Sequence, residues 1–271
     1  MVMMKRVLTI AGSDSGGGAG IQADLKTFSA FGVYGMSVIT AVTAQNTLRV
    51  NGITGIPPKF VGLQFESVLA DIGADGVKTG MLYTPEIVQI VAHKIHKSRI
   101  PHVVVDPVLV AKDGSSLLER RAIDVLKHDL FPLATVVTPN VPEAEIFTDM
   151  PIQSLDDMKE AAHIMVNRGC RAVLIKGGHL EGQAVDVLFD GDVCSSWTSS
   201  RIKTRNTHGT GCTLSAAIVA NLVKGKSLQQ AIGISKTFVT KAIQNALSLG
   251  KGQGPLNHFV RIEGMEEADD G

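Results

Sequence analysis

Short apolar segments alternate with helical patterns along this chain, and that alternation is what most constrains its fold. Two of the segments are Val103-Val104-Val105 and Ala172-Val173-Leu174-Ile175, in which consecutive positions are apolar. A strand of this kind is buried on both faces, which is typical of a parallel sheet with helices on either side. The sequence therefore predicts an α/β fold, a three-layer α/β/α sandwich around a mostly parallel central sheet.

The pattern also places the individual elements. The expected strands are residues 6–11, 36–44, 76–80, 102–106, 135–139 and 171–176. The expected helices are residues 21–31, 58–72, 85–97, 117–130, 155–167, 211–224 and 228–249. Residues 185–189 and 193–199 predict a hairpin, because the intervening Asp190-Gly191 favours a tight turn. Without a linker or repeat, we expect a single domain over residues 1–262 and a disordered acidic tail over residues 263–271.

Charge and composition narrow the class of ligand. Lys and Arg total 26 and Asp and Glu total 26, so the formal net charge is zero and favours neither nucleic acid nor an anionic membrane. No apolar segment approaches a transmembrane length, and the run after Lys5 and Arg6 is too short for a signal peptide. The three cysteines lack a C-x-x-C pairing, which indicates free thiols in the cytoplasm. We expect a small-molecule ligand.

A glycine-rich turn runs directly into a strong helix near residue 210. Its sequence is Asn206-Thr207-His208-Gly209-Thr210-Gly211-Cys212-Thr213. The first N–H groups of a helix lack partners within the helix and carry partial positive charge, so a phosphoryl group binds there readily. The turn predicts an anion site at Gly209, Thr210 and Gly211. Cys212 lies in the first helical turn, where its thiolate is expected to be favoured.

Polar residues follow several of the expected strands. Ligands gather at the carboxyl ends of strands in such sheets, so these residues are candidates for chemistry. They include Asp106, Asn140, Glu143 and Lys176. Two acids, an amide and a lysine are what Mg²⁺ and a polyphosphate require. The set favours an ATP-dependent phosphotransferase.

Other nucleotide and metal motifs fit poorly. The glycines of residues 12–20 do not match G-x-G-x-x-G in a usable register, which disfavours a nicotinamide dehydrogenase. Gly225-Lys226-Ser227 resembles the end of a P-loop but follows a helix, so we interpret it as a turn between helices. His93 and His96 share a helix face and are expected to be solvated.

Taken together, the motifs resemble those of the hydroxymethylpyrimidine/phosphomethylpyrimidine kinases of thiamine biosynthesis, within the ribokinase-like superfamily. The motifs that carry the resemblance are Ala11-Gly12-Ser13-Asp14-Ser15-Gly16-Gly17-Gly18-Ala19-Gly20-Ile21-Gln22-Ala23-Asp24, Ala44-Gln45-Asn46-Thr47, Lys78-Thr79-Gly80-Met81, Asp106-Pro107-Val108, Thr138-Pro139-Asn140, Lys176-Gly177-Gly178-His179 and His208-Gly209-Thr210-Gly211-Cys212-Thr213. The resemblance spans about residues 5–259. It implies a homodimer that uses Mg·ATP to phosphorylate 4-amino-5-hydroxymethyl-2-methylpyrimidine and then its monophosphate.

The resemblance also implies roles for individual residues. Those expected around the pyrimidine are Gln45, Gly12, Ala19, Asp24, Met81 and Val108. Asp106 and Glu143 are expected near Mg²⁺, with Asn140, Lys176 and Thr210 near the nucleotide phosphates. Gly209, Thr210, Gly211 and Cys212 would form the anion hole. Most of the superfamily has an aspartate as base at the position of Cys212, so a basic role for this thiol is a hypothesis.

Two alternatives remain at this stage. A pyridoxine/pyridoxal kinase has the same fold and also phosphorylates a primary alcohol on a heteroaromatic ring. Gln45 favours the pyrimidine, because a carboxamide complements an amine next to a ring nitrogen. A non-catalytic vitamin-binding regulatory protein is the other alternative. The presence of Asp106, Glu143, Lys176 and Cys212 argues against it.

Overall fold

The computed structural model describes residues 4–111, 114–115, 117–178, 180 and 182–263. The strands are β1 (Arg6–Asp14), β2 (Tyr34–Gln45), β3 (Val50–Gly55), β4 (Gly76–Thr79), β5 (His102–Val105), β6 (Val136–Val137), β7 (Val173–Ile175), β8 (Ala184–Phe189) and β9 (Cys194–Ser199). In this part of the chain they form one sheet in the order β3-β2-β1-β4-β5-β6-β7-β8-β9. The six neighbouring strands β2-β1-β4-β5-β6-β7 pair in parallel. Strand β3 at one edge and strands β8 and β9 at the other pair antiparallel with their neighbours.

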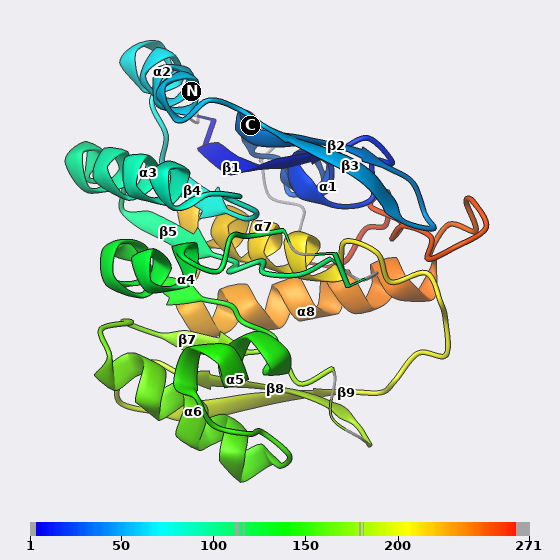
Figure 1. Cartoon of the computed structure of the whole chain (residues 1–271). Helices are drawn as coiled ribbons and strands as arrows, with labels where there is room; N and C mark the ends of the chain where they lie inside the picture. Colours follow the sequence, from blue (N-terminus) through cyan, green and yellow to red (C-terminus); the bar gives the residue numbers. More distant parts are fainter. Residues whose placement is uncertain (1–3, 112–113, 116, 179, 181, 264–271) are drawn as a thin grey trace, which may run out of the picture.

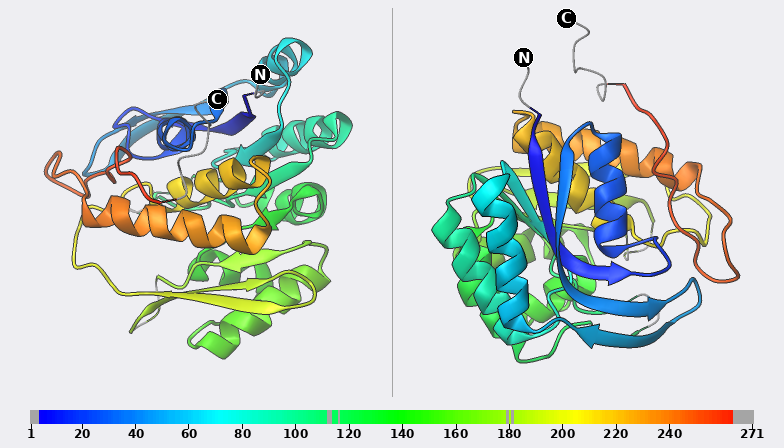
Figure 2. Two further views of the ribbon diagram at one scale, coloured as in Figure 1. Left: turned by 180° about the vertical axis from the view of Figure 1, so that it is seen from behind. Right: turned by 90° about the horizontal axis from the view of Figure 1, so that it is seen from above.

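Helices cover both faces of this sheet (Figures 1 and 2). The helices are α1 (Gly20–Ala30), α2 (Pro58–Asp71), α3 (Pro85–Ser98), α4 (Ala122–Val125), α5 (Val141–Thr148), α6 (Leu155–Asn167), α7 (Thr210–Val223) and α8 (Leu228–Gln244). Two short helical turns, η1 (Leu126–Leu130) and η2 (Phe131–Leu133), follow α4. Helices α1, α7 and α8 cover one face, and α2 to α6 cover the other (Figure 1). The α/β/α expectation is thereby confirmed.

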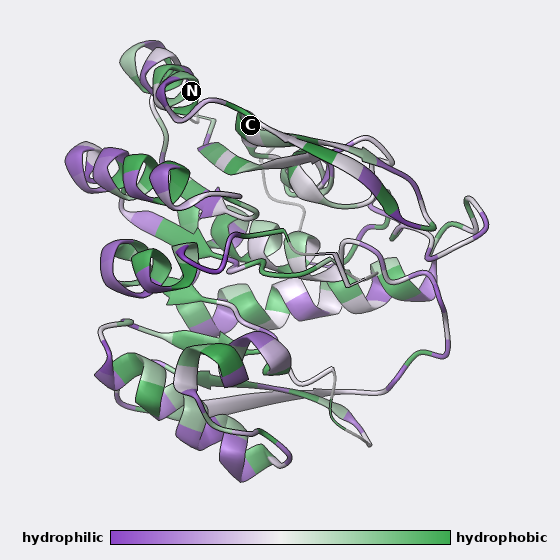
Figure 3. Cartoon of the chain, in the orientation of Figure 1, coloured by the Kyte–Doolittle hydropathy of each residue, from purple (hydrophilic) through white to green (hydrophobic). Residues whose placement is uncertain are grey.

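Each face of the sheet has its own hydrophobic core. Phe28 of α1 and Phe238 of α8 belong to the first, and Phe65 of α2 and Phe147 of α5 belong to the second. Helices α3 and α6 show hydrophilic residues on part of their surface and hydrophobic residues on the rest (Figure 3). Such amphipathic helices bury one side against the sheet. Helix α7 is buried from Thr213 to Val223, because α1, α8 and the sheet surround it.

Several elements differ from the sequence-based expectation. The edge strand β3 was not predicted, because it contains Gly52 and Gly55 and buries little of its surface. Helix α5 was not predicted either. It has only eight residues, and its start depends on a capping box between Asn140 and Glu143.

Two predicted helices are shorter than expected. The segment 117–130 becomes helical only at Ala122, because the N–H of Leu117 donates to the carbonyl of Leu109 instead. Helix α8 ends at Gln244, and the following loop returns to Thr47 through the N–H of Gln253. The predicted tail lies outside the described residues from position 264 onward.

Two predicted turns agree with the structure. The hairpin is β8 and β9, joined at Gly191, whose φ of 96° suits a glycine turn. Gly225-Lys226-Ser227 forms the turn between α7 and α8, with Ser227 as the N-cap. Among the helices that the structure describes, none has the length and hydrophobicity needed to cross a bilayer.

Candidate active site

A cavity of about 160 Å³ opens where the parallel strands end. Its lining comes from the ends of β1, β2, β4, β5, β6 and β7 and from the start of α7. The predicted site residues among the lining are Gly12, Ala19, Gln45, Met81, Asp106, Val108, Asn140, Glu143, Lys176, Gly209, Thr210, Gly211 and Cys212. Parallel packing brings these residues together although they are far apart in sequence.

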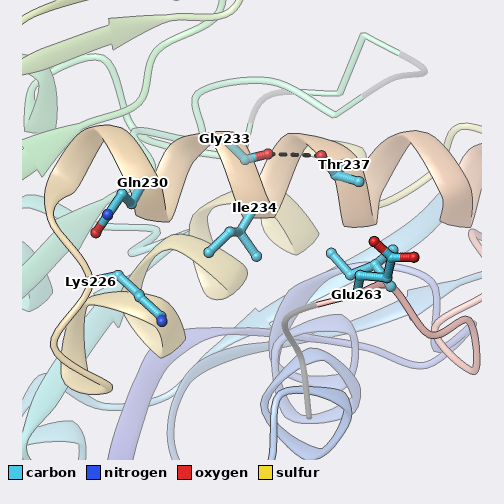
Figure 4. A pocket seen from close by; sticks show the side chains of 7 residues that line it. Lys226, Gln230, Gly233, Ile234, Thr237 and Glu263 are labelled. Atoms are coloured by element: carbon cyan, nitrogen blue, oxygen red, sulfur yellow. Dashed lines mark hydrogen bonds between the residues drawn. The ribbon is translucent and has the colours of Figure 1, made fainter. Parts of the chain in front are cut away.

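A second, larger cavity of about 370 Å³ lies along α8, away from the strand ends (Figure 4). Lys226, Ile234 and Glu263 are among its lining residues. Thr237 on this wall donates its hydroxyl to the carbonyl of Gly233 at 3.1 Å. This cavity is a groove beside a helix with one lysine and one acid in its lining, whereas Asp106, Glu143 and Lys176 all line the first. We therefore place the chemistry in the smaller cavity.

The turn before α7 is built from glycines for two different reasons. Gly209 is the N-cap, with a φ of 85°, and a Cβ atom there would lie 1.8 Å from the carbonyl oxygen of Gly18. At Gly211, a Cβ atom would meet Lys176 Nζ at 3.3 Å and Asp106 Oδ2 at 3.5 Å. Gly209 thus allows two loops to touch, whereas Gly211 keeps space open beside the charged pair of the cavity.

Asp106 and Lys176 form that pair. The Nζ atom of Lys176 is 2.8 Å from Oδ1 of Asp106, and the side chains are 15% and 2% exposed. Burial opposes the charge on Lys176, but the carboxylates of Asp106 and Glu143 outweigh burial and raise its pKa. Lys176 is therefore a cation at neutral pH, on the wall of an open cavity.

Glu143 is the third charged residue of this group. Its Oε2 accepts the N–H of Asn140 at 2.8 Å, which completes the capping box of α5. Burial raises the pKa of Glu143 to about 7, because Lys176 offsets burial only in part and Asp106 adds repulsion. A buried carboxyl group with this pKa would bind a further cation favourably.

A second lysine, Lys78 of β4, is among the residues around the cavity although its side chain has no exposed surface, and it was missed by the sequence analysis. Its Nζ atom is 3.0 and 2.9 Å from the two carboxylate oxygens of Asp24, and Oδ2 of Asp24 also accepts the hydroxyl of Thr9 at 2.6 Å. Burial opposes the charge on Lys78, but the nearby acidic groups, Asp24 foremost, together outweigh burial and raise the pKa of the amine. The sequence did contain a signal for this residue. Lys78 lies within a strand that was predicted to be buried, and a buried lysine needs an acidic partner.

This pairing changes the interpretation of Asp24. We expected Asp24 beside the pyrimidine, yet it is fully buried and is not among the residues that line the cavity. Its two oxygens are taken by Lys78 and Thr9. Asp24 therefore lies behind the cavity wall and fixes Lys78.

The expectation of a favoured thiolate at Cys212 is wrong for this structure. Burial raises the pKa of Cys212 to about 11; Lys78 opposes this increase, and Asp24 and Asp106 add to it. At pH 7 a thiol with that pKa is ionised in about one molecule in 10⁴. Cys212 is thus a neutral thiol at pH 7. The partial positive charge at the N-terminus of α7 is not enough to overcome the effect of burial on its pKa.

Gln45 ends β2, and its amide takes part in a polar network. One end of the amide is 3.1 Å from Oγ1 of Thr43, and the other is 3.3 Å from Nε2 of His208. The same His208 nitrogen is 2.8 Å from Oδ2 of Asp14. Asp14 and His208 belong to motifs that we identified from the sequence, but neither was predicted to have a role in the site.

The chain is similar in sequence to proteins of known name. Residues 14–257 match the family model described as phosphomethylpyrimidine kinase. A hydroxymethylpyrimidine/phosphomethylpyrimidine kinase of Bacillus subtilis is 49% identical over 94% of this chain and 95% of its own length. The thiamine biosynthesis bifunctional protein of Geobacter sulfurreducens is 52% identical over 96% of this chain. The match spans only 54% of that longer protein.

A solved structure is also similar to this chain. The ADP complex of Bacillus subtilis pyridoxal kinase superposes with a TM-score of 0.88, with 41% identity over 94% of this chain and 98% of that one. Both fold and sequence are therefore similar to this pyridoxal kinase, and the identity to the Bacillus subtilis pyrimidine kinase is higher, 49% against 41%. The chain belongs to the phosphomethylpyrimidine kinase family.

Proposed function

We propose, from membership of this family, that the chain is a kinase that transfers a phosphoryl group from ATP to 4-amino-5-hydroxymethyl-2-methylpyrimidine, and then a second one to the resulting monophosphate. The observation that carries this proposal is a single cavity with two unlike walls. Gln45 and Met81 stand on one wall, and Lys176 with the start of α7 stands on the other. A ring and a polyphosphate could meet between them.

ATP as the donor is supported by the charges on the second wall. Lys176 presents a cation beside Gly211, and the first N–H groups of α7 add partial positive charge. Asn140 lies at the same wall. Phosphoryl transfer depends mainly on positioning and charge stabilisation, which these groups can supply.

Mg²⁺ fits the same wall. Asp106 and Glu143 would hold it, and the raised pKa of Glu143 favours an added cation there. No cluster of three or more His, Cys, Asp or Glu ligands exists in the described part of the chain, so the ion would take most ligands from phosphate and water. When bound, Mg²⁺ neutralises charge on the phosphates.

The residues of the chain suggest how the reaction is arranged. Gln45 and Met81 would hold the ring so that the hydroxymethyl oxygen faces the start of α7. The alcohol oxygen then attacks the terminal phosphorus of ATP, the bond to the β-phosphate oxygen breaks, and the alcohol loses its proton. We propose Cys212 as the nearest protein group to receive that proton. Because Asp106 raises the pKa of Cys212, neutralising Asp106 would make the thiolate more accessible.

The decisive experiment is phosphorus NMR of the products from Mg·ATP and each candidate alcohol. We expect the aminopyrimidine alcohol to give a phosphate monoester first and a pyrophosphate ester later. The variant Lys176→Met, purified in parallel, controls for contaminating kinases. Phosphorylation of pyridoxal but not of the aminopyrimidine would replace this function with the alternative one. Binding without any ester product would favour a vitamin-binding protein.

We further propose a cytoplasmic homodimer. The three cysteines are free thiols, which is typical of a reducing compartment. Phe60 and Leu63 of α2 are each more than half exposed, and α2 packs on β2, where Val42 is 44% exposed. A second copy could cover these apolar side chains. Light scattering of the native chain and of Leu63→Glu tests this, with a monomeric variant expected.

A further inference from the structure

The amide of Gln45 can be oriented in two ways, and its neighbours decide between them. The two ends of a carboxamide have the same shape but opposite hydrogen-bonding character, since NH₂ donates and oxygen accepts. In the structure Oε1 of this amide is 3.1 Å from Oγ1 of Thr43 and its Nε2 is 3.3 Å from Nε2 of His208, but a rotation of the amide plane exchanges the two ends. Which end accepts therefore depends on whether Nε2 of His208 carries a proton.

Asp14 fixes that proton. Its carboxylate accepts the backbone N–H groups of Gly16, Gly18 and Ala19 and lies 2.8 Å from Nε2 of His208. Burial alone would raise the pKa of Asp14, but the hydrogen bonds from His208 and from the backbone hold it below its ordinary value. At neutral pH Asp14 is an acceptor with no proton to donate. His208 must therefore donate from Nε2.

The rest of the network then follows. An N–H group on His208 cannot bond to an N–H group of Gln45, so the amide oxygen must face His208. The NH₂ group then faces Thr43, whose oxygen is free to accept because its hydroxyl can donate to the carbonyl of Ser13 at 3.0 Å. In the opposite orientation the NH₂ group could donate to His208 only if Nε2 were bare, and a bare Nε2 would lie 2.8 Å from a carboxylate oxygen. Two acceptors at that distance repel each other.

We propose that His208 is a specificity-determining residue, which fixes the direction in which Gln45 presents its donor and acceptor to the substrate. After these internal bonds, Gln45 keeps one N–H and one oxygen lone pair for a ligand. The acceptor side faces His208 and the donor side faces Thr43. A ligand must therefore place its own donor toward His208 and its own acceptor toward Thr43. This inference rests on the proposed function for the identity of the ligand, an amine adjacent to a ring nitrogen.

The position of His208 links this direction to the phosphate site. A Cβ atom at Gly18 would lie 2.5 Å from Cδ2 of His208, so the imidazole is packed directly against the first glycine loop. The next residue, Gly209, is the N-cap of α7. A test must therefore separate loss of the N–H donor from loss of the ring. His208→Phe keeps a ring of similar size, and His208→Gln keeps an N–H donor near the place of Nε2.

The first measurement needs no kinase activity. Long-range proton–nitrogen correlation spectra of the full chain, labelled at its eight histidines, report which ring nitrogen carries the proton. The signal that disappears in His208→Phe identifies His208. We expect a protonated Nε2 at pH 7. A bare Nε2 with the proton on Nδ1 would overturn the inference, whatever the outcome for the proposed function.

The second measurement concerns recognition. His208→Phe should raise the dissociation constant of the aminopyrimidine alcohol, measured by calorimetry, about 10- to 100-fold, because a misdirected amide leaves polar groups unpaired. His208→Gln should recover most of the affinity, and KM for ATP should change little in both. Equal losses in the two variants, or a loss confined to KM for ATP, would overturn the specificity role. Melting curves of both variants check that the fold is intact.

If the wild-type chain binds the aminopyrimidine alcohol but forms no ester, the proposed kinase function fails while the role of His208 is still decided by these two measurements. If it binds pyridoxal instead, the direction set by His208 predicts that the acceptor of that ring faces Thr43. Reduced pyridoxal binding in His208→Phe, recovered in His208→Gln, would support the role. Unchanged pyridoxal binding in His208→Phe would contradict it.

Discussion

Two lysine–aspartate pairs lie between the sheet and α7, and water reaches only one of them. Lys78 and Asp24 are 2.9 Å apart and both are fully enclosed. Lys176 and Asp106 are 2.8 Å apart, but 15% of the Lys176 side chain is exposed to the cavity. The chemistry of the pairs is the same. Exposure to the cavity therefore decides which lysine can exchange its aspartate partner for a ligand.

The difference predicts different consequences when each pair is broken. An enclosed pair contributes little net stability, but removal of one partner leaves a buried charge without compensation, which is strongly destabilising. A pair beside a cavity can be relaxed by water or by a ligand. We therefore expect that breaking the Lys78–Asp24 pair mainly lowers the free energy of unfolding, and that breaking the Lys176–Asp106 pair mainly lowers the turnover rate.

The largest effect is expected at Lys176. Lys176→Met should lower kcat by about 10³- to 10⁵-fold, the range for removing a cation that stabilises a transferring phosphoryl group. Its melting temperature should stay close to that of the native chain. Lys159→Met is the matched control, because Lys159 pairs with Asp156 on the surface. Turnover near the native value in Lys176→Met would place the phosphate-binding cation elsewhere.

Asp24→Asn tests the enclosed pair. It should lower the free energy of unfolding by about 3–5 kcal/mol, because the ammonium group of Lys78 stays buried without its counter-charge. Urea denaturation measures this, and the double variant Asp24→Asn/Lys78→Met should regain part of the loss. A stable Asp24→Asn chain that has lost its activity would mean that Asp24 contacts substrate after all.

Gly209 and Gly211, in the turn before α7, provide a second test of the difference between effects on turnover and effects on stability. Gly211→Ala points a methyl group at Lys176 and Asp106, so the protein should fold but turn over about 10²- to 10³-fold more slowly. Gly209→Ala places its methyl group against the backbone of Gly18 and should reduce stability instead. Thermal melting and turnover of both variants distinguish these effects. An active, folded Gly211→Ala would remove this turn from phosphoryl transfer.

Cys212 lies close to both pairs, and a thiolate at this position would raise the pKa of Lys78 and that of Lys176. If it receives the alcohol proton, Cys212→Ala should lower kcat by about 10²-fold, at the lower end for a general base, with KM for ATP unchanged. Steady-state kinetics with the alcohol and ATP varied in turn give both values. Unchanged kcat would show that the thiol takes no part in proton transfer.

The smallest effect is expected at Glu143, and it depends on pH. The folded chain holds the proton of Glu143 up to about pH 7, whereas the ordinary value is 4.5. Stability therefore decreases as pH rises through that window, because the unfolded chain binds fewer protons. Glu143→Gln should be more stable than the native chain by ~2 kcal/mol at pH 8, or roughly 4–8 °C in Tm, and should show no such gain at pH 4. An equal difference at both pH values would contradict the raised pKa.

The sequence alone was sufficient for the fold class and for most of the cavity. Runs such as Val103-Val104-Val105 predict a buried parallel sheet, and a parallel sheet gathers its strand ends at one edge. Asp106 and Lys176 could therefore be placed together before the structure was known. Strand β3 and helix α5 could not be predicted, because a short exposed strand and an eight-residue helix carry weak patterns.

What only the tertiary structure decided is which charges are paired and which are open. Lys78 and Asp24 are 54 residues apart in sequence, and no local pattern shows that they meet. The direction of Gln45 depends on His208, which is 163 residues away. The pKa of Cys212 follows from burial and from the sum of several charges, whereas its position in the helix suggested the opposite. Periodicity along the chain determines which face is buried, but electrostatic interactions depend on distances across the fold and on the exclusion of water, and these exist only once the chain has packed.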